Sequence, residues 1–205
     1  MKILRSSSEA EMLLCFLKAE YTSPRFAEDL HAAMAQCHAE PELILQGDPE
    51  NEMENALRAE VMGQFRGYGR DEELFQNFPV GKADWVYAQL EAEDLARIRY
   101  IDYSYWNEIS NGTSCPLDAV GNIRADHRIF DVPHDRFLAG EQFLRSGGKF
   151  PPIVLLWSEK GPYVIVEGHL RMTAYALAPE FFPGTFCYLG TCTQDELKRW
   201  NVNYD

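Results

Sequence analysis

Two short apolar runs near each other in the second half of the chain limit its fold most strongly. Ile153–Trp157 and Tyr163–Val166 each have the length of a buried strand, and Lys160-Gly161-Pro162 between them is typical of a tight connection. An isolated hairpin is only marginally stable in water, so further strands or helices must cover it. The sequence therefore predicts a hairpin or a similar tight connection here.

The segment after the second run is predicted to be a helix that starts at a glycine. Gly168 follows Glu167 directly, and residues 170–177 have a helical composition that Pro179 ends. The first turn of a helix has unpaired N–H groups and the positive end of the helix dipole, and a glycine there lets a ligand approach the backbone closely. This turn is therefore a candidate site for an anion.

The side chains of the same turn suit a phosphate group. Arg171 offers a planar fork of donors, and Thr173 can add a hydroxyl. His169 either transfers a proton or only donates a hydrogen bond, and Glu167 either holds Mg²⁺ or pairs with Arg171. The predicted phosphate or nucleotide site comprises Glu167, Gly168, His169, Arg171 and Thr173, with His169 and Arg171 as its catalytic residues.

The order of these features resembles the ParB/sulfiredoxin superfamily. The resemblance rests on the Pro151-Pro152-Ile153 entry to a strand, the second strand, the Gly168-x-x-Arg171 turn, and a tail, 193–200, that is similar to the closing helix of sulfiredoxins. It extends over about residues 129–200 and implies a phosphate cradle. His169 stands where sulfiredoxins have their catalytic cysteine, so the resemblance does not extend to sulfinic-acid repair.

Signals for helix starts recur in the first part of the chain. Ser8 is followed by Glu11 in an N-capping pattern, and Ser23-Pro24 opens a second helix. Asp48-Pro49 opens a third, which Gly63 is predicted to close. The expected fold is α+β: a mainly helical region of unknown role over residues 1–120, packed on a small mixed-sheet ParB/sulfiredoxin-like domain over residues 121–205.

Several other segments have interpretable patterns. Residues 93–110 have apolar positions at helical spacing, and their aromatic residues either pack on a neighbouring domain or line a ligand site. Residues 128–132 are predicted to be a strand and 135–145 a helix, while 85–90 fits either. A cluster of acidic and histidine residues either caps a helix or loosely resembles a metal site; it comprises Asp126, His127, Asp131, His134 and Asp135.

Composition excludes several classes of partner. The chain has 19 Lys and Arg against 32 Asp and Glu, a net charge of −13, and no basic run, so nucleic acid is not an expected partner. No segment is long and apolar enough to span a membrane. The 5 cysteines are widely spaced and unpaired in pattern, which indicates a reducing cytoplasm.

The turn and the resemblance together imply a protein that binds a nucleotide or another phosphorylated small molecule. One interpretation is an enzyme that takes a nucleotide such as ATP, with Mg²⁺, and catalyses phosphoryl transfer or nucleotide hydrolysis. A second is a non-catalytic regulatory module that binds a nucleotide or a phosphorylated ligand. A third is a ParB-like nuclease, which the acidic composition disfavours.

Overall fold

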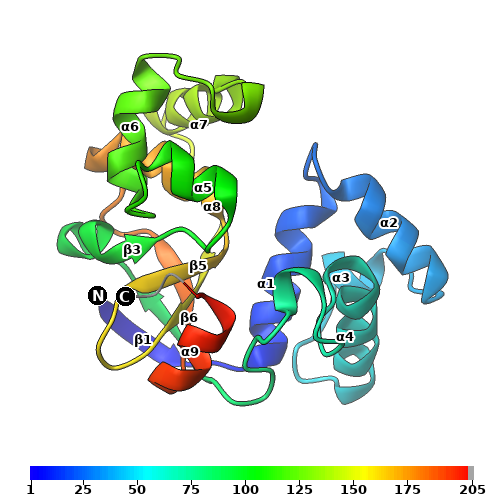
Figure 1. The fold of residues 1–205 in the computed structure, drawn as a ribbon. Helices are drawn as coiled ribbons and strands as arrows, with labels where there is room; N and C mark the ends of the chain where they lie inside the picture. Colours follow the sequence, from blue (N-terminus) through cyan, green and yellow to red (C-terminus); the bar gives the residue numbers. More distant parts are fainter. Residues whose placement is uncertain (203–205) are drawn as a thin grey trace.

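The computed structural model describes residues 1–202 and is built around a six-stranded mixed sheet (Figure 1). The strand order is β1-β2-β6-β4-β5-β3, with parallel pairing of β6 with β4 and of β5 with β3. The predicted hairpin is confirmed, because β4 and β5 pair antiparallel. The strands are β1 (Lys2–Ser6), β2 (Asp84–Gln89), β3 (Ile98–Arg99), β4 (Ile153–Trp157), β5 (Tyr163–Glu167) and β6 (Phe186–Thr191).

The helices divide between two lobes (Figure 1). Four of them stand beside the sheet and form the helical lobe; they are α1 (Glu9–Tyr21), α2 (Ala27–Gln36), α3 (Glu42–Leu45) and α4 (Glu52–Arg66). The others belong to the sheet lobe, with α5 to α8 at one end of the sheet and α9 at the other. Their bounds are α5 (Ser104–Ile109), α6 (Pro116–Arg124), α7 (Asp135–Arg145), α8 (His169–Leu177) and α9 (Gln194–Trp200).

The α+β class is as predicted, and the sheet draws on both of the predicted regions. β1, β2 and β3 all precede residue 120, so residues 1–120 supply half of the strands as well as the helical lobe. In the part of the chain that the structure describes, no helix combines the length and the apolar composition needed to cross a lipid bilayer.

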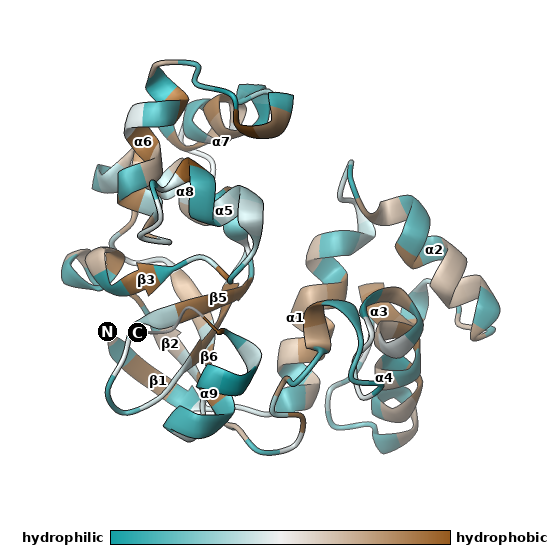
Figure 2. Ribbon diagram, in the orientation of Figure 1, coloured by the Kyte–Doolittle hydropathy of each residue, from teal (hydrophilic) through white to brown (hydrophobic). Residues whose placement is uncertain are grey.

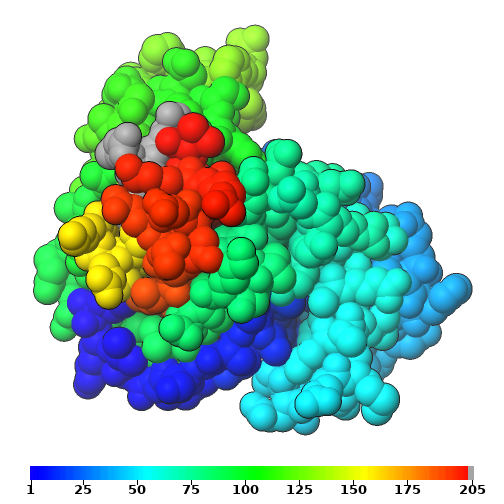
Figure 3. Space-filling model, turned by 60° about the horizontal axis from the view of Figure 1, so that its bottom comes forward, coloured from blue at the N-terminus to red at the C-terminus, as the bar shows by residue number. Residues whose placement is uncertain are grey.

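A single apolar core joins the two lobes. Phe75 and Phe78 follow α4, and the Phe78 ring meets Trp200 of α9 edge to face at 5.3 Å. The Trp200 indole N–H also donates to the Leu74 carbonyl at 2.8 Å. The space-filling view shows the segment after α4, in teal, between the helical lobe and α9 (Figure 3). Apolar residues gather on the central strands, while much of α2, α4 and α9 is polar (Figure 2).

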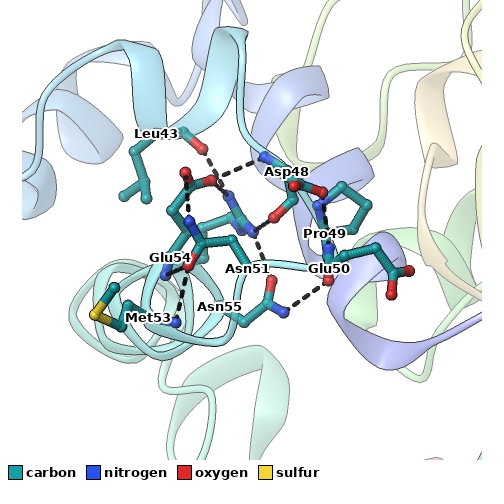
Figure 4. A network of polar contacts seen from close by, with 9 residues as sticks. Leu43, Asp48, Pro49, Glu50, Asn51, Met53, Glu54 and Asn55 are labelled. Atoms are coloured by element: carbon teal, nitrogen blue, oxygen red, sulfur yellow. Dashed lines mark hydrogen bonds and ion pairs between the residues drawn. The ribbon is translucent and has the colours of Figure 1, made fainter.

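The helical lobe is held by the buried guanidinium of Arg58 on α4. Its Nη1 donates to the Leu43 carbonyl at 3.0 Å, and its Nη2 donates to the Asp48 carbonyl at 2.6 Å and to Asn55 Oδ1 at 2.5 Å. These acceptors lie in α3, in the α3–α4 connection and on α4, and Figure 4 shows them gathered around one point. The network closes the connection between the two helices.

Residues 93–110 are not the single helix that their spacing predicts. A 3₁₀ turn at Ala92–Arg97 leads into β3, and only α5 is α-helical. β3 pairs in parallel with β5, and the N–H of Tyr100 then donates to the Ser114 carbonyl at 2.7 Å. Sheet pairing and a loop contact therefore replace the helical hydrogen bonds, which local spacing does not reveal.

Two further predictions are wrong for reasons of backbone conformation. Residues 128–132 contain a 3₁₀ turn in place of a strand, because Phe130 has a φ of 50°. Gly63 does not close α4; the helix continues to Arg66 and ends at Gly67, whose φ is 79°. A Cβ at Gly63 would lie 2.9 Å from Arg70 Nε, so this glycine admits a neighbouring segment inside the helix.

Candidate functional site

The predicted strand–turn–helix around Gly168 is present. β5 ends at Glu167 and α8 begins at His169. Gly168 has a φ of 107°, and a Cβ there would lie 2.7 Å from Ile153 Cγ2. The glycine is thus required by its left-handed backbone and by close packing on β4. It is buried and is not among the described residues that line the main cavity.

Arg171 faces the interior of the sheet lobe. Its side chain is 8% exposed, and its Nη1 donates to the carbonyls of Pro151 (3.0 Å) and Pro152 (2.6 Å). Its Nη2 donates to Glu167 Oε1 at 2.5 Å. Of the two roles predicted for Glu167, pairing with Arg171 is therefore the one observed. The guanidinium thus connects the residues that precede β4 to α8, which is a structural role.

Thr173 is also turned into the core. Its hydroxyl donates to the His169 carbonyl at 2.8 Å and lies 2.7 Å from the hydroxyl of Tyr100. The side chain is fully buried. Among the described residues, Gly168, Arg171 and Thr173 do not line the main cavity, in contrast to their predicted role in a cradle.

His169 does face a cavity, as part of an aromatic stack. Its ring lies nearly parallel to that of Trp106, with centroids 5.1 Å apart, and Nε2 accepts a long hydrogen bond of 3.5 Å from the N–H of Ile101. Burial, followed by the charges of Arg66, Arg171 and Arg25, lowers the pKa of His169 to about 3. The ring is neutral at pH 7 with its proton on Nδ1, so it can donate a hydrogen bond but is not an acid.

The cavity has a volume of about 480 Å³ and lies where the helical lobe meets the sheet lobe. This volume is in the range of sites for small organic ligands. Its walls come from α1, the turn before α2, the end of α4, α5, the 3₁₀ turn at Ile129–Asp131, the start of α7, and the β5–α8 turn. Glu167 and His169 are the two predicted site residues that line it.

Three arginines from three separate elements surround the cavity: Arg25 before α2, Arg66 at the end of α4 and Arg136 on α7. Within residues 1–202, none of them forms an ion pair with a carboxylate. Each lies over an aromatic ring instead; Arg25 and Arg66 are 4.6 and 4.8 Å from the centroid of Phe26. The buried Nε atoms of Arg66 and Arg136 have no hydrogen-bond partner among the described residues.

Two carboxylates line the same cavity in different environments. Glu167 is paired with Arg171, whereas Glu20 on α1 is 6% exposed and lies near the Ser23 side chain. Burial, followed by the negative charge of Glu167, raises the pKa of Glu20 to about 7. Ser23, Arg66 and Arg171 act in the opposite direction. Glu20 therefore titrates near neutral pH.

Aromatic rings complete the walls. Tyr103, Tyr105 and Trp106 come from the start of α5, and the hydroxyl of Tyr105 lies beside Arg136 without a well-formed hydrogen bond. Phe130 is 64% exposed and has the left-handed backbone noted above, which is rare for a bulky residue. Strained conformations of this kind concentrate at ligand sites. Part of the 93–110 aromatic set thus faces a cavity, and Tyr100 packs in the core.

The sequence does not indicate the three cavity arginines or Glu20. They are spread over more than a hundred residues and share no motif. The predicted end of a helix at Gly63 also leaves Arg66 in a loop, where its direction cannot be inferred. Only the aromatic spacing at 103–106 gives a local signal.

The acidic and histidine side chains near Asp126 do not come together around one point. Among residues 1–202 the structure forms no group of three or more His, Cys, Asp or Glu side chains suited to a metal ion. Asp126 pairs with Arg128, and His134 Nε2 lies 3.0 Å from the His127 carbonyl. The capping interpretation is wrong as well, because His134 is the N-cap residue of α7 and the described structure has no side-chain cap there.

Comparison with known proteins gives this chain no relatives: no family model, no curated protein and no solved structure matches it. Membership of the ParB/sulfiredoxin superfamily therefore stays a prediction. It rests on the hairpin, the Gly168-x-x-Arg171 turn and the closing helix.

Proposed function

We propose that this protein binds a nucleotide, or a closely related phosphorylated molecule with a heterocyclic ring, in the cavity between the lobes. The observation that carries the proposal is the set of three arginines around one aromatic-walled cavity, which form no ion pair with any carboxylate of the described residues. This site differs from the predicted cradle, although Glu167 and His169 belong to both. Arg25, Arg66 and Arg136 have the phosphate-binding role that the sequence assigns to Arg171.

A phosphate group fits the electrostatics of the arginines. Arg25 has a lowered pKa because it is partly desolvated and lies near Arg136 and Arg66, so the three positive charges disfavour one another. An anion among them would replace this repulsion with charge-assisted hydrogen bonds. The buried Nε donors of Arg66 and Arg136 would then gain acceptors, as buried polar groups in proteins almost always do.

A ring fits the remaining walls. Tyr103, Tyr105, Trp106 and Phe130 offer flat apolar surfaces for a stacked base, and His169 offers its Nδ1–H as a donor. A site that combines aromatic walls with a few polar groups is typical of small-molecule binding. The arginines lie around a cavity and the chain has a net charge of −13, which disfavours a long nucleic acid as the ligand.

The test is a thermal-shift panel of matched ligands on the full chain. ATP, ADP and AMP are compared with adenosine and with inorganic triphosphate, each with and without Mg²⁺. A ligand at a hundred times its Kd should stabilise the protein by about 2.7 kcal/mol. We expect the nucleotides to raise the Tm more than adenosine or triphosphate alone, because only they carry both recognised parts. Equal shifts with triphosphate would reduce the site to an anion site, and no shift with any ligand would refute the proposal.

A further inference from the structure

We propose that Glu20 is the general base of a nucleoside triphosphate hydrolase, and that it accepts a proton from the water that attacks the terminal phosphate. This step rests on the proposed function, since it needs a nucleotide in the cavity. It assigns turnover to the site and gives the proton-transfer role, one of the two that the sequence leaves open for His169, to a carboxylate on α1.

The geometry separates the two cavity carboxylates. Glu167 Oε1 receives the Arg171 Nη2 donor at 2.5 Å, and that guanidinium also holds the two prolyl carbonyls. Glu20 lines the same cavity at the end of α1 and, within the described chain, forms no ion pair. One carboxylate is thus structural, and the other is free to exchange a proton with a ligand.

The surroundings of Glu20 give its carboxylate the affinity for protons that a base needs near neutral pH. Ionisable groups act on it from three packed elements: Glu167 on β5, Arg66 on α4 and Arg171 on α8, and the Ser23 side chain lies near it. Burial and Glu167 outweigh the two arginines and raise its pKa to about 7. Such a pKa lies near the optimum for general-base catalysis at physiological pH. The remaining ionisable groups around the cavity are Arg25, Arg136, His169, Tyr103 and Tyr105.

His169 is unsuited to this task. Its Nε2 faces the N–H of Ile101, and its pKa of about 3 makes it a very weak base. It lies in a stack with Trp106 and Tyr100, which fixes the ring plane. We assign it a positioning role as a neutral donor to the nucleotide.

The reaction balances with water as the only co-reactant. The water oxygen forms a bond to the terminal phosphorus while the bond from that phosphorus to the bridging oxygen breaks. The electron pair of the broken bond leaves with the nucleoside diphosphate, and one water proton passes to the Glu20 carboxylate. The products are nucleoside diphosphate, inorganic phosphate and a proton that Glu20 later releases. Arg66 and Arg136 would stabilise the charge on the transferred phosphoryl oxygens.

The experiment measures ATP binding and phosphate release on the same proteins. The variant is Glu20→Gln, which keeps the shape of the side chain but cannot accept the proton. The control is Glu60→Gln, which removes an exposed carboxylate from α4. Binding is measured by calorimetry and phosphate release by a coupled assay, both with Mg²⁺ present. We expect wild type and Glu60→Gln to release phosphate, and Glu20→Gln to bind ATP within about threefold while its rate falls about 100-fold or more.

The outcomes separate the two proposals. A wild type that binds ATP without releasing phosphate overturns the hydrolase and leaves the binding function standing. A Glu20→Gln variant with an unchanged rate overturns the role of Glu20. Absence of ATP binding overturns both. If Glu20→Gln does not fold, the wild-type pH profile decides: the rate must rise through about pH 7 as Glu20 ionises, and a flat profile contradicts the base assignment.

Discussion

Arg58 and Arg66 lie two turns apart on α4 and differ in what surrounds their charge. Arg58 is 0% exposed, and its terminal nitrogens donate to two carbonyls and to the side chains of Glu54 and Asn55. Arg66 lies at the cavity over Phe26, and among residues 1–202 none of its nitrogens has an acceptor. The Nε of Arg58 also lacks one, so the difference lies in the terminal nitrogens. Arg58 therefore stabilises the fold of the helical lobe, whereas the protein does not use the hydrogen-bond donors of Arg66. An arginine at a cavity therefore indicates a ligand site only when its terminal nitrogens lack protein acceptors.

Arg171 belongs with Arg58 by this criterion. It lies in the turn whose sequence most resembles a phosphate cradle, yet its terminal nitrogens are engaged by Pro151, Pro152 and Glu167. The contrast with Arg66 can be tested, because structural arginines should control stability and cavity arginines should control affinity.

The largest expected effect is the loss of stability in Arg58→Met. The substitution leaves the carbonyls of Leu43 and Asp48 without donors inside the helical lobe, although the apolar volume is kept. We expect the free energy of unfolding to fall by about 3–5 kcal/mol, the range for breaking a buried charged network. Urea unfolding measures it, with Arg199→Met on the exposed face of α9 as the control. A loss below about 1 kcal/mol would show that solvent reaches these carbonyls.

Arg171→Ala should follow with a loss of about 2–4 kcal/mol, because three acceptors lose their donor near the entry to β4. The affinity for a nucleotide should change by less than about threefold, since the guanidinium does not line the cavity. Unfolding and calorimetry on the same variant make the comparison. A stable variant with much weaker binding would restore the phosphate role that the sequence predicts for Arg171.

Arg66→Ala should lower the affinity for a nucleotide and leave the stability nearly unchanged, the opposite of what we expect for Arg171→Ala. Removing charge-assisted hydrogen bonds to a phosphate should weaken nucleotide binding by about 1.5–3 kcal/mol, or roughly 10- to 150-fold. Stability should hold or rise slightly, because one of three repelling charges is gone. Arg66→Lys should recover only part of the affinity, since an ammonium cannot copy the planar fork. Binding that stays unchanged in Arg66→Ala would contradict the proposed function at its central residue.

Local patterns predict much of the sheet lobe and little of the cavity. The two apolar runs and Gly168 correctly indicate β4, β5 and the start of α8. Each of these features depends on neighbours in the sequence. The strand at 98–99 is missed because its partner β5 lies more than sixty residues away.

The cavity depends on how the lobes meet, and this is why its residues escape prediction. Arg25, Arg66 and Arg136 come together only where residues of the helical lobe and of the sheet lobe line the same cavity. Arg171 misleads for a similar reason: its position at a helix start suggests an exposed clamp, but the Pro151 and Pro152 carbonyls turn toward it. The spacing of residues in the sequence predicts the direction in which a side chain leaves its helix. It does not predict which hydrogen-bond acceptors distant segments bring to that side chain.

The smallest expected effect is on the pH dependence of stability, where two cavity residues act in opposite directions. The pKa of Glu20 is raised to about 7 from an ordinary 4.5, so between these values the folded state holds a proton that the unfolded chain has released. The stability contributed by Glu20 therefore falls as pH rises through this window. The pKa of His169 is lowered to about 3 from 6.5, so the unfolded chain holds the extra proton and the contribution of His169 rises with pH.

Between pH 4.5 and 6.5 the two slopes largely cancel in the wild type. Glu20→Gln removes the falling slope, so the stability of this variant should rise with pH by up to about 1.4 kcal/mol per unit. His169→Gln removes the rising slope, so the stability of that variant should fall with pH by a similar amount. Urea unfolding at pH 5 and at pH 6.5 measures both relative to the wild type, which cancels the contribution of exposed carboxylates. If Glu20→Gln shows the wild-type pH dependence, Glu20 is already ionised in the folded protein, and its assignment as a base that titrates near neutral pH is wrong.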